Sequence, residues 1–226
     1  MCYTLTMRIT ALQPQTKDPE RLNLFVDGQF LMGINALIAL QMRLKVGQEL
    51  TPQQVEQLRQ EEALQQAIAR ALNYLSFRPR SREEVRRYLQ RKETPPDLIN
   101  PVLERLDQLE LINDQAFAEF WIESRARFNP KGAQAIKNEL RQKGVTREVV
   151  DEMVDDEQDE ERARQAARKK AQSLTGQSGM DFKTFRLRLG AFLQRRGFSY
   201  EIATRTVREL WQELTMAEED NYDEDV

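Results

Sequence analysis

The sequence predicts a mainly α-helical protein: an elongated, curved array of three tandem three-helix repeats, preceded by a small N-terminal module that contains a β-hairpin. Three observations predict this fold. The chain is rich in Leu, Gln, Glu and Arg and has only nine Gly and eight Pro, a composition that favours helix over sheet. An Asp-Gly pair joins two short apolar runs near the N-terminus, which is typical of a hairpin. From residue 51 onward, one short phrase recurs three times.

The N-terminal module is predicted over residues 1–50. Residues 21–26 and 30–32 are apolar-rich runs joined by Asp27-Gly28, and a type I′ turn needs positive φ at both of its central residues. Residues 9–12 suit a third strand, and residues 35–44 a short helix. Residues 1–6 fit no pattern, which makes Met7 a candidate start of the protein.

Three helix starts are predicted beyond this module. Thr51-Pro52-Gln53-Gln54 is a capping box with Pro at the first helical position. Ser81-Arg82-Glu83-Glu84 is a second capping box, and Asn129-Pro130 again places a capping residue before a Pro.

The recurring phrase defines the repeats. It reads Leu89-Gln-Arg-Lys92, Leu140-Arg-Gln-Lys143 and Leu193-Gln-Arg-Arg196. Gly144 and Gly197 follow the second and third copies and are expected to end a helix as left-handed C-caps. A helix precedes each phrase, at about residues 57–76, 114–127 and 158–173, and another follows it. We therefore expect repeats over residues 51–112, 113–156 and 157–214, stacked through their apolar faces, and an acidic disordered tail over residues 215–226.

The composition excludes several classes of function. With no His and a single Cys, the chain lacks the residues for Ser-His-Asp or Cys-His nucleophiles, for His general acid–base catalysis, and for a zinc or disulfide framework. No Gly-rich phosphate loop is present. We expect no enzyme activity, cofactor or metal. The single Cys and the absence of a signal peptide or membrane-length apolar run indicate a cytoplasmic protein.

The charged residues are segregated along the chain. The net charge is −3, but residues 215–226 hold six acids and no base, so the rest of the chain has a slight basic excess. A pI near 5.4 argues against dedicated tight DNA binding. The acidic tail is either a plain solvated segment, a mimic of DNA charge or a restraint on the basic residues.

Basic residues at the ends of the middle helices are the candidate partner-binding residues. They recur at equivalent places in the repeats: Arg86, Arg87, Arg91, Lys92, Arg141, Lys143, Arg195 and Arg196. In a regular stack they form a spaced row that suits an ionic partner. The alternative is that they only complement helix dipoles. A helix-turn-helix DNA reader is a further alternative, although the acids after Thr146 lie where phosphates would bind.

The second repeat carries an aromatic group at core spacing, Phe117, Phe120, Trp121 and Phe128. We expect these side chains, and Trp211 in the third repeat, to pack in the core. The alternative is a surface for base stacking or for a partner.

The ordered set of motifs resembles the RecX family of regulatory proteins over residues 62–212. Its marks are Arg78-Pro-Arg80-Ser81 with Glu84 and Leu89, Leu111-Ile-Asn113-Asp114 with Phe117-Ala118, Trp121 with Arg125, Pro130-Lys131-Gly132 leading to Glu139-Leu140 and Lys143-Gly144-Val145, and Arg195-Arg196-Gly197-Phe198. Two positions depart from the family pattern: Glu93 and Glu110 stand where Gly is common. Residues 8–50 resemble the N-terminal extension of longer members.

The resemblance implies a regulator that binds the RecA recombinase, and because nothing in the sequence suggests an obligate dimer we expect a monomer. Family members lie along the groove of the RecA filament on single-stranded DNA and restrain its ATP hydrolysis, recombination and co-protease activity in the SOS response and DNA repair. It adds four basic residues to the candidate partner-binding set: Arg78, Arg80, Arg125 and Lys131. Two other classes remain open, a direct nucleic-acid binder that competes for DNA and a repeat scaffold for another partner.

Overall fold

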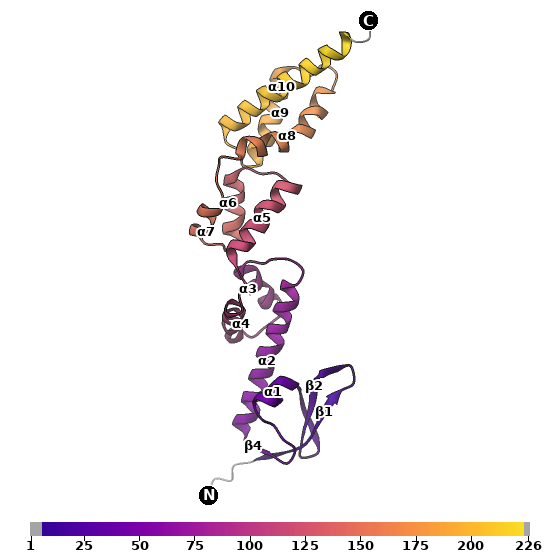
Figure 1. Cartoon of the computed structure of the whole chain (residues 1–226), viewed down its shortest axis with the longest axis vertical. Helices are drawn as coiled ribbons and strands as arrows, with labels where there is room; N and C mark the ends of the chain where they lie inside the picture. Colours follow the sequence, from indigo (N-terminus) through magenta and orange to yellow (C-terminus); the bar gives the residue numbers. More distant parts are fainter. Residues whose placement is uncertain (1–5, 224–226) are drawn as a thin grey trace. The chain divides into compact units, whose positions relative to one another are not determined.

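The structure is a computed structural model that describes residues 6–223, with side chains through residue 216. In this range a small sheet is followed by helices (Figure 1). The described residues form two compact units. The first contains the residues up to 78 together with residues 85–111, and the second contains residues 79–84 together with those from 112 onward.

An antiparallel sheet forms the N-terminal module. Its strands are β1 (Met7–Gln15), β2 (Asp18–Val26), β3 (Gln29–Asn35) and β4 (Glu49–Leu50), in the order β3-β2-β1-β4. Asp27 and Gly28 join β2 to β3 with φ angles of 49° and 81°, the backbone that a type I′ turn requires. This confirms the predicted hairpin. The short helix α1 (Ala36–Gln41) follows β3, with the Asn35 side chain accepting from the Leu37 amide.

The core of this module is built from the sheet and the first turns of α2 (Pro52–Leu75). Its buried side chains include Ile9, Leu24, Ile34 and Leu58. Glu62 on α2 is also buried, and its carboxylate lies 2.7 Å from the Arg21 guanidinium and accepts a hydrogen bond from the Asn35 amide. A buried carboxylate needs such partners, so Glu62 ties α2 to the sheet.

The first repeat shares α2 with the N-terminal module. Thr51 and Gln54 form the predicted capping box, and the helix that they start is continuous from Pro52 to Leu75, which confirms the predicted helix start. The other helices of this repeat are α3 (Arg82–Arg91) and α4 (Pro96–Gln108). Val85, Leu89, Val102, Leu103 and Leu106 are fully buried, as their helical spacing predicts.

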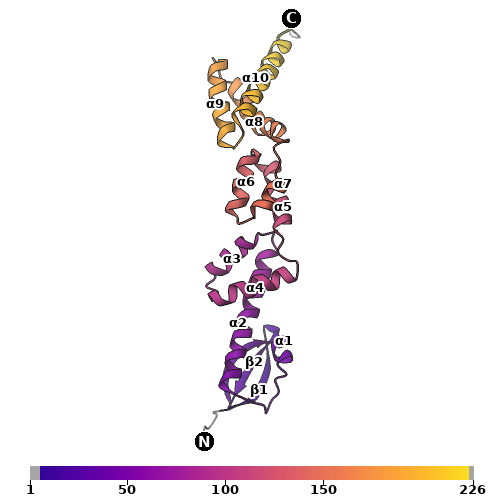
Figure 2. The ribbon, with the colours of Figure 1, turned by 90° about the vertical axis from the view of Figure 1, so that its left-hand side faces the viewer.

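The second unit contains two further helix trios, visible as separate groups in Figure 2. They are α5 (Asp114–Phe128), α6 (Ala133–Gln142) and α7 (Arg147–Met153), then α8 (Asp159–Thr175), α9 (Phe182–Arg195) and α10 (Tyr200–Asp223). Each trio has its own apolar core: Phe117, Ile136 and Leu140 are buried in one, and Phe185 and Leu189 in the other. The predicted three tandem three-helix repeats are confirmed.

The helix start predicted at Asn129-Pro130 is wrong. Asn129 ends α5, and α6 begins only at Ala133, after Gly132. The Ala133 amide donates to both carboxylate oxygens of Asp159 at 2.9 and 3.0 Å. A carboxylate from the start of α8, in the following repeat, therefore caps α6 in place of a local side chain, and the local sequence does not reveal this partner.

The predicted start of a disordered tail at residue 215 also differs from the structure. Helix α10 continues without a break to Asp223, so the acidic segment begins inside a helix. Residues 224–226 of the expected tail lie outside the described residues. Across the described chain, every helix is too short or too polar to span a lipid bilayer.

Candidate partner interface

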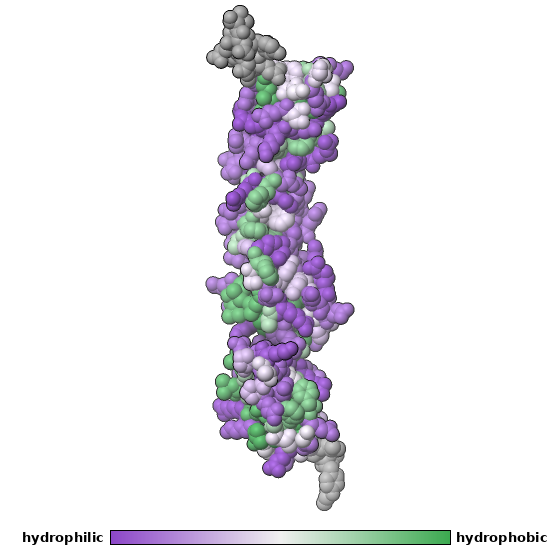
Figure 3. Space-filling view, turned by 90° about the vertical axis from the view of Figure 1, so that its right-hand side faces the viewer, coloured by the Kyte–Doolittle hydropathy of each residue, from purple (hydrophilic) through white to green (hydrophobic). Residues whose placement is uncertain are grey.

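The surface is rich in polar side chains. On the face shown in Figure 3, hydrophilic residues dominate and hydrophobic ones gather in separate patches. The predicted partner-binding cations do not share one environment on this surface. They divide into exposed side chains and side chains that hold the fold together.

Four of the predicted cations are well exposed: Arg87, Arg91, Lys92 and Arg195. Arg141 is also exposed, and its guanidinium lies 3.2 Å from Asp151. Three others are partly buried: Arg86, which donates to the Asn100 side chain at 2.9 Å, and Arg78 and Arg80 in the segment before α3. Arg78, Arg80, Arg86 and Arg87 each make a further interaction within the protein.

Arg125 and Lys131 belong to an ionic cluster around Glu139. The Glu139 carboxylate accepts from Trp121 Nε1 at 2.8 Å and Arg125 Nε at 2.7 Å, and it also pairs with Lys131. The Arg125 guanidinium lies 4.4 Å from the centre of the Trp121 ring. Burial acts to raise the pKa of Glu139, but the three hydrogen bonds outweigh it and hold the pKa below its usual value. These cations therefore stabilise the second repeat.

Lys143 fastens the start of α3 to the end of α6. Its ammonium lies 2.6 Å from Glu84 and 4.3 Å from the Trp121 ring centre, and its carbonyl accepts from the Ser81 hydroxyl at 2.6 Å. Gly144 follows with a φ of 83°, and a β-carbon placed on it would lie 2.4 Å from the β-carbon of Glu83. Glycine is needed here for its conformation and also for this close approach.

Arg196 occupies the equivalent place one repeat later. Its guanidinium donates to the Pro130 carbonyl at 3.0 Å, and its own carbonyl accepts from the Gly132 amide at 3.0 Å. A β-carbon on Gly197 would lie 2.4 Å from the β-carbon of Ala135. We call this arrangement the repeat joint: the start of one middle helix packs on the glycine that ends the next. It occurs at Gly144 and at Gly197.

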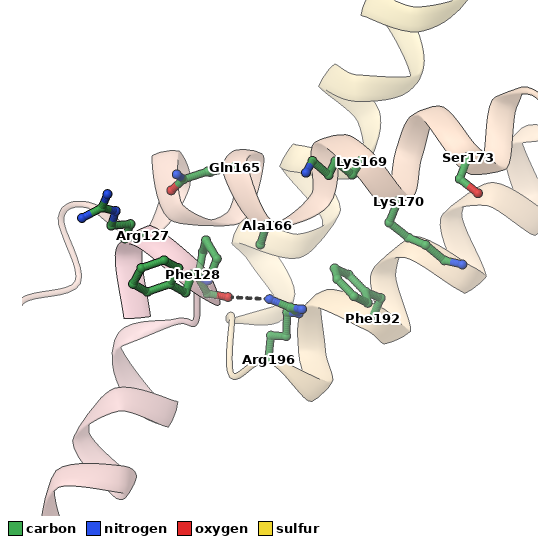
Figure 4. A pocket seen from close by; sticks show the side chains of 10 residues that line it. Arg127, Phe128, Gln165, Ala166, Lys169, Lys170, Ser173, Phe192 and Arg196 are labelled. Atoms are coloured by element: carbon green, nitrogen blue, oxygen red, sulfur yellow. Dashed lines mark hydrogen bonds between the residues drawn. The ribbon is translucent and has the colours of Figure 1, made fainter. Parts of the chain in front are cut away.

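Arg196 also lines a pocket that the sequence did not predict. The pocket has a volume of about 550 Å³ and lies in the second unit (Figure 4). Its walls come from the end of α5, from α8 and from the end of α9, and consist of Arg127, Phe128, Pro130, Gln165, Ala166, Lys169, Lys170, Ser173, Phe192 and Arg196. Phe128 is 75% exposed, so its predicted place in the core is wrong, whereas Phe117 is buried as expected.

The described side chains offer no arrangement of three or more Cys, Asp or Glu that suits a metal ion. The exposed cations suit an anionic partner, and the pocket adds two aromatic rings to its basic side chains. The sequence does carry a signal for the pocket, because Phe128 lies between Arg127 and Asn129 at the polar end of its helix. The helical spacing of Phe128 from Phe117 favoured a core position instead.

Comparison with known families matches the whole succession of modules. A sequence model of the N-terminal domain of regulatory protein RecX matches residues 7–51. Models of the first, second and third three-helix domains of RecX match residues 67–106, 113–154 and 156–207.

Individual relatives agree. The chain is 30% identical over 213 residues to regulatory protein RecX of Listeria welshimeri, covering 94% of this chain and 79% of the relative. It is 30% identical over 202 residues to regulatory protein RecX of Bacillus subtilis, covering 89% and 76%. A crystal structure of regulatory protein RecX aligns with a TM-score of 0.71 at 25% identity, covering 87% of this chain and 96% of that one. RecX from Lactobacillus salivarius aligns with a TM-score of 0.56 at 27% identity, covering 66% and 97%. With its four modules matched in order, the chain belongs to the RecX family of regulatory proteins.

Proposed function

We propose that this protein binds the RecA filament on single-stranded DNA and inhibits its ATP hydrolysis, strand exchange and co-protease activity. The observation that carries the proposal is membership of the RecX family over the N-terminal module and all three repeats. The relatives are named regulatory proteins, which supports action by binding over action as an enzyme. It works as a cytoplasmic monomer.

The exposed cations give this proposal a chemical basis. Arg87, Arg91 and Lys92 at the end of α3, Arg141 on α6 and Arg195 on α9 are exposed in successive repeats. Contacts that are individually weak become tight in sum when they are linked in one body. We therefore assign partner binding to these five residues, and intramolecular packing to Arg125, Lys131, Lys143 and Arg196.

The test is the single-stranded-DNA-dependent ATP hydrolysis of RecA, titrated with this protein. Suppression at a small fraction of the RecA concentration is expected, because one bound regulator restrains many filament subunits. Binding to the same DNA without RecA is measured in parallel at two salt concentrations. Suppression that begins only when the protein saturates the DNA contradicts the proposal.

A second candidate function is direct binding to nucleic acid, in competition with RecA for the strand. The basic pocket lined by Phe128 and Phe192 favours it. Competition predicts an affinity for naked DNA that falls steeply with salt, because each neutralised phosphate releases counterions. The same pair of measurements separates the two candidates.

A further inference from the structure

The pocket at the end of α5 combines positive charge with aromatic surface. Arg127, Lys169, Lys170 and Arg196 line it, and no acid does. Among the residues whose side chains are described, Arg127, Lys169 and Lys170 form no ion pair with a carboxylate. Clustered cations repel one another, so an unneutralised group of this kind attracts an anion.

The two phenylalanine rings give the pocket an apolar part. In Figure 4 the Arg196 side chain lies between Phe128 and Phe192. Its guanidinium is 4.6 Å from the centre of the Phe192 ring, and that of Arg127 is 5.2 Å from the centre of the Phe128 ring. Arg196 is held in place by the Pro130 carbonyl. Burial lowers the pKa of Arg196 from its usual value, but an arginine stays protonated in proteins.

Phe128 is the distinctive residue of the pocket. A phenylalanine at the end of a helix with three quarters of its surface exposed gains little from the hydrophobic effect of folding. Its ring therefore presents a free face beside a group of cations. A free aromatic face next to positive charge is the arrangement on which proteins stack nucleic-acid bases while they bind the phosphates.

We propose that this pocket binds a nucleotide unit, with the base on the Phe128 ring and the phosphate held by cations of the pocket wall, which include Lys169 and Lys170 on α8. An acidic peptide would satisfy the cations but would leave the exposed ring of Phe128 without a flat partner, so the combination of charge and exposed ring favours a nucleotide. The volume of about 550 Å³ lies in the range of small-molecule sites. The unit is either part of a single strand or a free nucleotide. This inference rests on the second candidate function, direct binding to nucleic acid, for which it names the site, and it does not require RecA.

The test uses the full-length protein and a fluorescein-labelled oligothymidine of about 12 nucleotides, followed by anisotropy at low salt without RecA. Phe128→Ala is expected to weaken binding about tenfold, since loss of one base–ring stack costs on this order, and Phe128→Trp is expected to restore it. Removing two charges with Lys169→Gln/Lys170→Gln should reduce the slope of log affinity against log salt by about 1.4, as expected for two phosphate contacts to a single strand.

Matched controls lie in the same unit, outside the pocket. Tyr200 is 72% exposed, so Tyr200→Ala removes an equally free ring. Lys183 and Arg186 are exposed on α9, and Lys183→Gln/Arg186→Gln removes two charges. Both controls are expected to bind the oligonucleotide as the unaltered protein does. Circular dichroism confirms that each variant is folded.

Competition distinguishes the sources of the nucleotide. Displacement of the probe by thymidine monophosphate, but not by inorganic phosphate, assigns the pocket to a free nucleotide unit; displacement by unlabelled oligonucleotide alone assigns it to a strand. Either result supports the site if it depends on Phe128. Displacement by polyglutamate that Phe128→Ala leaves unchanged overturns the proposal in favour of an acidic peptide. So does a Phe128→Ala variant that binds like Tyr200→Ala.

The inference and the proposed function fail separately. If the protein suppresses RecA but binds no oligonucleotide, the nucleotide site is refuted and the regulatory role is supported. If oligonucleotide binding depends on Phe128 but RecA is unaffected at substoichiometric ratios, the nucleotide site is supported and the regulatory role is refuted.

Discussion

At the residue scale, basic side chains in equivalent positions have different roles. Lys92, Lys143 and Arg196 all end a middle helix, and each lies over an aromatic ring, at 5.9, 4.3 and 4.6 Å from the ring centres. Only Lys92 is well exposed. The repeat pattern predicts that these positions correspond, but it does not predict that two of the three cations are used inside the protein.

Charge reversal at the exposed end of α3 should weaken partner binding without unfolding the protein. For Arg91→Glu/Lys92→Glu we expect about a fivefold loss in the potency of RecA inhibition, growing at low salt, because exposed interfacial charges act mainly on encounter. The measurement is the ATP hydrolysis titration with thermal unfolding alongside. Lys17→Glu/Lys45→Glu in the N-terminal module makes the same change in charge at exposed positions. Equal potency of the two double variants would refute the role of the α3 end.

Glu139 should make the second repeat sensitive to acid. Its pKa is lowered in the folded protein from an ordinary value of 4.5, so its contribution to stability is complete above about pH 4.5 and is lost as the pH falls through the lowered pKa. Glu139→Gln should therefore reduce stability at pH 7 and flatten the acidic limb of the stability curve. Urea unfolding between pH 3 and pH 7 checks this. A variant whose acid limb keeps the original slope would show that other carboxylates dominate.

At the element scale, the repeat joint decides where glycine is indispensable. Gly144 and Gly197 have φ angles of 83° and 85°, and Gly179 has a similar φ of 76°. The three differ in their surroundings. A β-carbon added to Gly144 or Gly197 would lie 2.4 Å from the β-carbon of a neighbouring residue, whereas one added to Gly179 would have no other atom within 4 Å. Conformation and packing can therefore be separated experimentally.

Alanine at the joint should cost more than alanine in an open turn. Gly179→Ala is expected to lower the free energy of unfolding by about 1 kcal/mol, because alanine is strained only by the left-handed backbone at this position. Gly144→Ala and Gly197→Ala must also move a neighbouring helix, and we expect a loss of about 2–4 kcal/mol in the free energy of unfolding for each. Urea denaturation followed by circular dichroism measures all three. If the three variants lose the same stability, close packing at the joint is not the cause.

At the scale of the whole molecule, most of the architecture could be predicted because it rests on local signals. The Asp27-Gly28 turn, the Thr51 capping box and the triple phrase are each encoded within a few residues. The exceptions depend on distant partners. Ala133 is capped by Asp159 from the following repeat, and Phe128 is exposed although its spacing from Phe117 fits a core position.

The same reasoning explains why the candidate site was harder to predict than the fold. Whether the Lys143 ammonium is available to a partner depends on its ion pair with Glu84, which lies 59 residues earlier in the sequence. The pocket is assembled from the ends of α5 and α9 and the length of α8, so no single segment carries its pattern. Family resemblance supplied the order of the modules, but it could not assign the exposure of individual cations.

The departure at Glu93 has a consequence for how this gene can change length. Glu93 takes the place of the joint glycine in the first repeat and has a φ of 55°. A middle helix packed against it from an added preceding repeat would meet a full side chain where Gly144 and Gly197 leave space. Tandem duplication can thus extend the chain internally with copies of its second or third repeat. The first repeat itself cannot be duplicated in this way, because one of its two copies would then follow another repeat and present Glu93 to that repeat's middle helix.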